Sequence, residues 1–129
     1  MKNISNHIES EYANFWIDGE IIFVVYKKGV VIDQKVAIKI VEDRLSLQQG
    51  KPFLVFCDAS GIKSIDKAAR NYLAIEGSIL ITATALLVNN PITNVMSDFY
   101  LKTSSHPCPI QAFTEKKEAM AFLKTHTSK

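Results

Sequence analysis

A run of five consecutive apolar residues near the middle of the chain constrains the fold most strongly. The run covers residues 53–57, FLVFC, and Gly50 and Pro52 precede it. A short, unbroken apolar run beside such turn residues is typical of a strand buried on both faces, as at the centre of a parallel sheet. We therefore predict a central strand at residues 53–57.

A polar turn and a helical pattern follow this strand. The turn contains three residue types that favour chain reversal: Asp58, Ser60 and Gly61. Ser64 is expected to cap a helix over residues 64–76, because its hydroxyl can accept from the first helical amides. Asp66 would then lie in the first turn, where the helix dipole stabilises negative charge. Polar side chains are thus predicted where strand, loop and helix meet.

Strand-like runs and helical patterns alternate along the rest of the chain. Strands are predicted over residues 12–17, 20–27, 53–57, 84–88 and 110–113. Helices are predicted over residues 33–49, 64–76 and 91–103 and after Thr114. This alternation calls for a mainly parallel sheet with crossover helices, and the Asp18-Gly19 turn predicts an antiparallel hairpin at its start. The predicted fold class is α/β, with a mixed sheet of about five strands and four helices.

The composition indicates one folded domain. The chain has 129 residues, of which 47% are hydrophobic and 22% charged, and this is enough to enclose a single core. Residues 1–11 are expected to form a polar lead-in and residues 125–129 a tail. A single domain is therefore predicted to span residues 1–129.

Charge and hydropathy limit the partners and the compartment. The net charge is only +2, with basic residues scattered among acidic ones, which argues against nucleic acid or an anionic membrane surface. No apolar run reaches the roughly 18 residues of a membrane span, and the N-terminus lacks a signal-peptide core. Cys57 lies in the apolar strand and is expected to be a reduced, packed thiol. These features predict a cytoplasmic protein without stable membrane insertion.

The helix predicted over residues 33–49 has two distinct faces. Asp33 is its expected cap, and its apolar residues recur at helical spacing. The charged residues on the opposite face are Lys35, Lys39, Glu42 and Arg44. We expect these four side chains to be solvated.

Three polar loops are predicted at the carboxyl ends of the strands, where sites gather in open α/β sheets. The candidate residues in the first two loops are Asp58, Ser60, Gly61, Ser64, Asp66, Asn89 and Asn90. The third loop holds Thr114, which is expected to cap the last helix, and Glu115. Their hydroxyls, amides and carboxylates suit an anion, a polar headgroup or a protein backbone. Alternatively, each side chain satisfies only local backbone donors.

Sequence signatures of catalysis are missing. The chain has no GxSxG, GxxxxGK[ST], GxGxxG or HExxH motif. His106 and Cys108 flank a proline but give too few ligands for a metal site. We therefore predict no catalytic residues, no metal and no cofactor, and a protein that is not an enzyme.

The stretch from Asp58 to Asp66, DASGIKSID, with Lys67-Ala68-Ala69 after it, resembles the signature of STAS domains. These are the SpoIIAA-like, anti-sigma-factor-antagonist-like proteins, and the order of elements is similar to a STAS/Sec14-like subgroup. The resemblance covers residues 12 to 124. It implies the STAS (SpoIIAA-like) sandwich and a regulatory, protein-binding role.

One position departs from the family pattern. In the regulatory family a serine that accepts phosphate follows the I-D pair, and this chain has Lys67 there. Lysine cannot accept phosphate from a serine kinase, so the usual phospho-serine switch is predicted to be absent. Lys67 could instead offer charge to an acidic partner group.

Two functions follow as hypotheses. The first is a non-enzymatic STAS-like regulatory module whose contact surface comprises Asp58, Ser60, Gly61, Ser64, Asp66, Lys67, Asn89 and Asn90. Its partner would be another protein or a second copy of the chain, and the adjacent Phe99 and Tyr100 allow a homodimer. The alternative is a carrier of a small ligand, a lipid or a nucleotide, which requires an apolar cavity.

Overall fold

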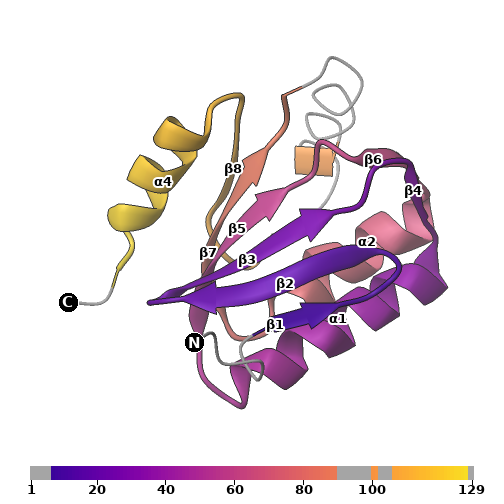
Figure 1. Cartoon of the computed structure of the whole chain (residues 1–129), viewed down its shortest axis with the longest axis horizontal. Helices are drawn as coiled ribbons and strands as arrows, with labels where there is room; N and C mark the ends of the chain where they lie inside the picture. The colour runs from indigo at the N-terminus through magenta and orange to yellow at the C-terminus, as the bar shows by residue number, and fades with distance from the viewer. Residues whose placement is uncertain (1–6, 90–99, 102–105, 128–129) are drawn as a thin grey trace.

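A computed structural model describes residues 7–89, 100–101 and 106–127 of the chain, and in it one sheet separates two layers of helices (Figure 1). Helices α1 (Gln34–Gln48) and α2 (Lys67–Ile75) pack against each other on one side of this sheet. Helix α4 (Lys116–Lys124) packs on the other side, against β5, β7 and β8. The predicted α/β sandwich is confirmed.

The main sheet has six strands in the order β1-β2-β3-β5-β7-β8. Their bounds are β1 His7–Glu9, β2 Ala13–Asp18, β3 Ile21–Tyr26, β5 Phe53–Asp58, β7 Ile81–Leu87 and β8 Ile110–Phe113. The first three strands are antiparallel neighbours, and every pair from β3 onward is parallel. The apolar run at residues 53–57 forms β5, which lies between β3 and β7 as predicted.

The turn of the N-terminal hairpin lies one residue later than the Asp18-Gly19 turn predicted from the sequence. Asp18 belongs to β2 and pairs with Ile21, so the two loop residues are Gly19 and Glu20. Gly19 has φ of +64°, a left-handed conformation that glycine adopts without a steric penalty. The glycine therefore supplies the reversal at the first loop position.

Two predicted helix starts are wrong. Ser64 does not cap a helix but lies in strand β6 (Ile62–Ile65). The cap of α2 is Asp66, whose Oδ1 accepts from the backbone N of Ala69 at 2.8 Å. Thr114 does not cap α4 either, because Glu115 occupies the cap position and makes no side-chain cap bond. The helix after β5 starts later because residues 62–65 first pair as a strand.

The cap of α1 and the extent of the remaining helices are clear within the described residues. Asp33 caps α1 as predicted, accepting from the backbone N of Val36 at 2.9 Å. A 3-10 turn, η2 (Glu76–Ser78), follows α2. The described part of the chain thus holds three α-helices rather than four. The helix predicted over residues 91–103 lies largely outside it, with only Tyr100 and Leu101 described, both helical.

Three short strands were not predicted. β1 lies in the expected polar lead-in, and β4 (Val30–Ile32) pairs in parallel with β6 as a separate two-stranded sheet. Strands of three or four residues contain too few positions to show an alternating pattern. They form because the neighbouring backbone offers partners, which local sequence does not reveal.

The apolar core divides into two clusters, one on each face of the sheet. Phe15, Ile22 and Ile32 belong to the cluster under α1 and α2. Ala83 and Leu123 belong to the cluster under α4, where small residues let the helix approach the sheet. No helix among the described residues is long and apolar enough to cross a membrane.

Candidate functional site

The loop after β5 is held closed by its own polar residues. The Oδ1 atom of Asp58 accepts from the backbone N of Ser60 at 3.0 Å. The Ser60 Oγ accepts from the backbone N of Asn89 at 3.2 Å, and this bond joins the loop to the end of β7. These side chains therefore tie together the carboxyl ends of two neighbouring strands.

Gly61 lies against the backbone at the end of β3. A Cβ at this position would be 2.6 Å from the carbonyl O of Tyr26 and 2.7 Å from that of Lys27. The Gly61 carbonyl accepts from the N of Gly29 at 2.7 Å. The signature glycine is thus explained by close approach between two backbone segments.

The remaining predicted site residues lie apart from this cluster. Ser64 is exposed in β6, and Asp66 and Lys67 are exposed at the start of α2. Asn89 joins the Ser60 loop, whereas Asn90 lies outside the described residues. The structure therefore brings Asp58, Ser60, Gly61 and Asn89 together, and leaves Ser64, Asp66 and Lys67 on a separate exposed stretch.

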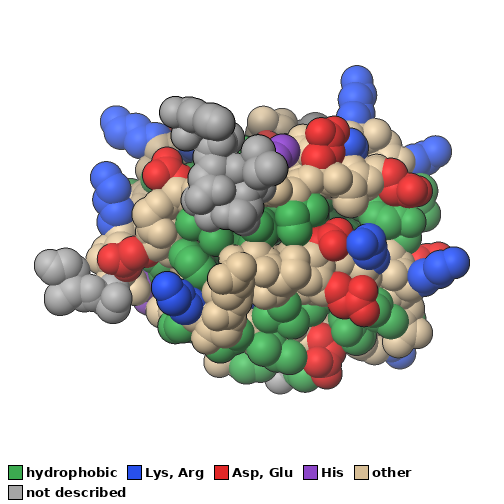
Figure 2. All heavy atoms as spheres, turned by 60° about the horizontal axis from the view of Figure 1, so that its bottom comes forward, with side chains coloured by type: hydrophobic (Ala, Val, Ile, Leu, Met, Phe, Trp, Pro, Cys, Tyr) green, Lys and Arg blue, Asp and Glu red, His purple; other side chains and the backbone are tan. Residues whose placement is uncertain are grey.

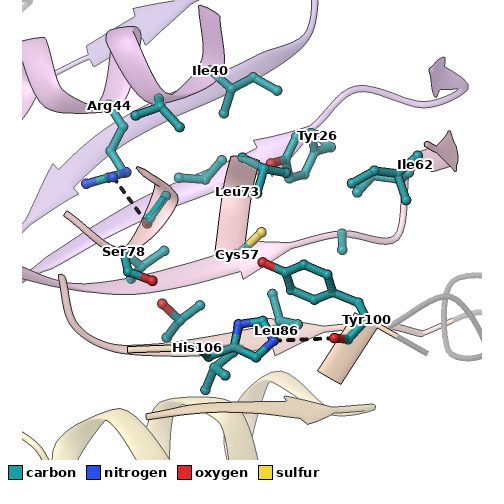
Figure 3. Close-up of a pocket in the computed structure, with 18 of the residues that line it drawn as sticks. Tyr26, Ile40, Arg44, Cys57, Ile62, Leu73, Ser78, Leu86, Tyr100 and His106 are labelled. Carbon is teal, nitrogen blue, oxygen red and sulfur yellow. Dashed lines mark hydrogen bonds between the residues drawn. The ribbon is translucent and has the colours of Figure 1, made fainter. Parts of the chain in front are cut away.

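A cavity that the sequence did not indicate lies between the sheet and helices α1 and α2 (Figure 3). Its volume is about 140 Å³. Most of its wall is aliphatic, from residues that include Val24, Ile40, Val55, Leu73 and Leu86. Its polar groups are few, as is typical of pockets for small molecules.

Arg44 supplies the cationic group of this cavity. Arg44 is 4% exposed, so the prediction that it is solvated is wrong. It shares one face of α1 with Ile40 and Gln48, four residues away on either side, and both are also buried. Burial in apolar surroundings lowers the pKa of Arg44 to about 10. The guanidinium therefore stays charged at neutral pH.

The partners of Arg44 among the described residues are neutral. Its Nη1 donates to the carbonyl O of Ile79 at 3.1 Å and to the side-chain oxygen of Gln48. Its Nη2 donates to the carbonyl O of Gly77 at 3.2 Å. No carboxylate among the described residues forms a salt bridge with it. The charge is thus solvated by oxygens but not neutralised within this part of the protein.

Tyr26, Tyr100 and Cys57 also line the cavity, and Figure 3 shows the Tyr100 ring reaching toward Cys57. Burial raises the pKa of both tyrosines above the ordinary value. Burial, with a smaller effect from Asp58, raises the pKa of the Cys57 thiol to about 12. At neutral pH the thiol is protonated and therefore a poor nucleophile.

His106 lines the cavity and contacts Tyr100. The two rings pack edge to face with centroids 4.6 Å apart, and the His106 Nε2 lies 3.3 Å from the Tyr100 carbonyl O. Within the described ranges, no group of three His, Cys, Asp or Glu side chains could hold a metal ion. Both cysteines are free thiols.

The surface shows no segregation by charge on the face drawn in Figure 2. Acidic and basic side chains of the described residues are interspersed there, with apolar side chains between them. Two described ion pairs link such charges, Lys27 with Glu9 and Lys39 with Asp43. Interspersed charge gives a weak electrostatic field.

Comparison with family models matches residues 15–127 to a domain of unknown function, DUF7793. The chain belongs to the DUF7793 family. No curated protein matches the DUF7793 chain significantly in sequence.

The fold of this DUF7793 protein is similar to that of a solved structure. The match is the crystal structure of an uncharacterised DUF3478-family protein with a SpoIIAA-like fold from Shewanella loihica PV-4. The two chains are 10% identical, with a TM-score of 0.57, and the match covers 86% of the DUF7793 chain and 91% of the other. At this identity the likeness shows the fold, and it confirms the SpoIIAA-like architecture predicted from DASGIKSID.

Proposed function

We propose that this protein is a non-enzymatic module that binds a small, largely apolar ligand in the cavity under α1 and α2. The observation that carries the proposal is the cavity itself, whose wall is mainly aliphatic. A well-formed apolar pocket with a few convergent polar groups is the usual site for a small molecule. A tightly packed interior on this face of the sheet would have argued for the opposite conclusion.

The size of the cavity limits the ligand. A dry cavity of about 150 Å³ in another protein holds a benzene molecule, and this cavity has a volume of about 140 Å³. The enclosed part of a ligand would therefore resemble a six-carbon ring or a six-carbon chain. A whole nucleotide is too large and too polar for this space, which favours the lipid-like form of the carrier hypothesis.

The groups around the cavity suit binding better than chemistry. The Cys57 thiol has a pKa of about 12, so it is not an activated nucleophile at neutral pH. Asp58 and Ser60, the polar residues at the end of β5, are engaged in bonds that close their own loop. Two free cysteines also fit the reducing cytoplasm that the sequence predicts.

A cavity-filling variant tests the proposal. Val55→Phe places a ring in the cavity, whereas Leu54→Phe puts the same ring on the opposite face of β5, in the cluster under α4. We expect 1-hexanol to shift the NMR signals of cavity methyl groups in the wild type and in Leu54→Phe, but not in Val55→Phe. Equal responses in all three proteins, or none in the wild type, would contradict the proposal.

A second candidate function is docking of a protein on the β4–β6 sheet. Val31 of β4 is 55% exposed and pairs with Ser64 of β6, so an apolar side chain lies beside the predicted contact residues. The partner would be a regulatory protein or a second copy of the chain. If self-association occurs here, Val31→Glu will weaken it in light scattering while Ile75→Glu, at a residue of similar exposure at the end of α2, will not.

A further inference from the structure

The polar wall of the cavity points to the chemical class of the ligand. Arg44 is a nearly fully buried cation that borders an aliphatic cavity, and its described partners are an amide oxygen and two backbone carbonyls. Burying a charge without an opposite charge is costly, and buried cations are normally paired with anions. An anion that reaches Arg44 in some state of the protein would offset this cost.

The hydrogen bonds of Arg44 leave donors for a ligand. A guanidinium carries five N–H groups, and three hydrogen bonds are made within the described residues. Two N–H groups are therefore without an acceptor in that part of the chain.

Holding the nearby carbonyls does not by itself require a cation. Gln48, one turn further along α1, performs that role as a neutral amide, donating to the carbonyl oxygens of Lys51 at 2.8 Å and Leu80 at 2.9 Å. A neutral side chain at position 44 could hold Gly77 and Ile79 in the same way. The positive charge of Arg44 is thus additional to what the local backbone needs.

We propose that the ligand is a small amphipathic anion, with a carboxylate that pairs with Arg44 and an apolar body that fills the cavity. This inference rests on the proposed function and adds the headgroup to it. Arginine suits a carboxylate because two of its N–H groups can donate in parallel to the two oxygens. The apolar body of about six carbons follows from the cavity volume of about 140 Å³.

A matched pair of probes separates the charge from the apolar body. Hexanoate and 1-hexanol share a six-carbon chain and differ in the headgroup, and hexanoate is ionised at pH 7. We expect hexanoate to bind the wild type at least about tenfold more tightly than 1-hexanol in NMR titrations, since hydrogen bonds between charged groups are the strong ones. Arg44→Gln should remove this preference while 1-hexanol still binds.

Two further variants keep the test decisive. Arg70→Gln removes an arginine that also donates to a carbonyl, that of Ile65, but does not line the cavity, so the preference for hexanoate should remain. Arg44→Lys keeps the charge and should retain part of the preference, even if Arg44→Gln does not fold. Equal binding of both probes by the wild type would overturn the proposal that the ligand is an anion, but not the proposal that the cavity binds a small apolar ligand. If neither probe binds, both proposals fail.

Discussion

Replacement of Gly61 by alanine tests the close packing of the signature loop on β3. The added Cβ would lie 2.6 Å from the carbonyl O of Tyr26, and 2.7 and 2.9 Å from the carbonyl O and C of Lys27. All three atoms belong to the backbone, so no side chain can rotate away. The loop between β5 and β6 must therefore move, or the end of β3 must.

The magnitude follows from the contacts that such a movement disturbs. Overpacking in a tight site costs about 1–3 kcal/mol, and loss of the hydrogen bond from Gly29 N to Gly61 O costs about 0.5–1.5 kcal/mol more. We expect Gly61→Ala to lower the free energy of unfolding by about 1.5–4.5 kcal/mol. Urea titration can measure this through Trp16, the single tryptophan, which stacks on Phe23.

Gly77 provides a matched control for this substitution. A Cβ there would meet only the side chain of Leu73, at 3.6 and 3.7 Å, which is ordinary van der Waals contact. Gly77→Ala should therefore be neutral or stabilise by about 0.4–1 kcal/mol, because alanine restricts the unfolded chain. An unchanged stability for Gly61→Ala, or an equal loss for both variants, would refute the argument from close approach.

Three further predictions concern stability. Asp66→Ala removes the cap bond to Ala69 and should lower the free energy of unfolding by about 1 kcal/mol in urea titration, with no change if the cap is irrelevant. Leu123→Ala empties a fully buried site under α4 and should cost about 2–5 kcal/mol in the same assay; a loss below 1 kcal/mol would contradict this packing. The pKa of Cys57 rises from 9.0 in the unfolded chain to about 12 in the folded protein. The contribution of this thiol to the free energy of unfolding is therefore full below pH 9 and declines as the pH rises toward 12. Between pH 8 and 10.5 the loss should be about 2 kcal/mol, and Cys57→Val should lack this part of the alkaline decline. Equal declines in both proteins would show that folding does not raise the pKa of the thiol.

The sequence predicted the central strand and the layers well because long apolar patterns report burial directly. Residues 53–57 form a short, unbroken apolar run next to turn residues, which is typical of a buried strand, and Asp33 is a cap at the start of a regular helical pattern. The start of α2 was misplaced because Ser64 and Asp66 are both good caps by type. Pairing of β6 with β4 decides between them, and that contact is non-local.

The candidate site was predicted less well than the fold. The loop of Asp58 and Ser60 was located correctly at the ends of β5 and β7, but its polar groups bond to each other and to the backbone. The cavity went unpredicted because its volume depends on how α1 and α2 lie on the sheet. Arg44 was misassigned because it lies at the boundary of the apolar face of α1, where a side chain can be either buried or exposed. The spacing of the apolar residues does not decide between these two environments for a single arginine.

The division between loop and cavity explains how the fold can be recognised without the function. Ser60 and Gly61 join the carboxyl ends of β3, β5 and β7, so the D-x-S-G pattern indicates how these strand ends pack together. The same pattern can therefore occur in proteins with different ligands, as expected when function depends on a site rather than on a fold. In this chain the residue that would distinguish the ligand is Arg44 of α1, which lies outside the signature and whose charge borders a mainly aliphatic cavity.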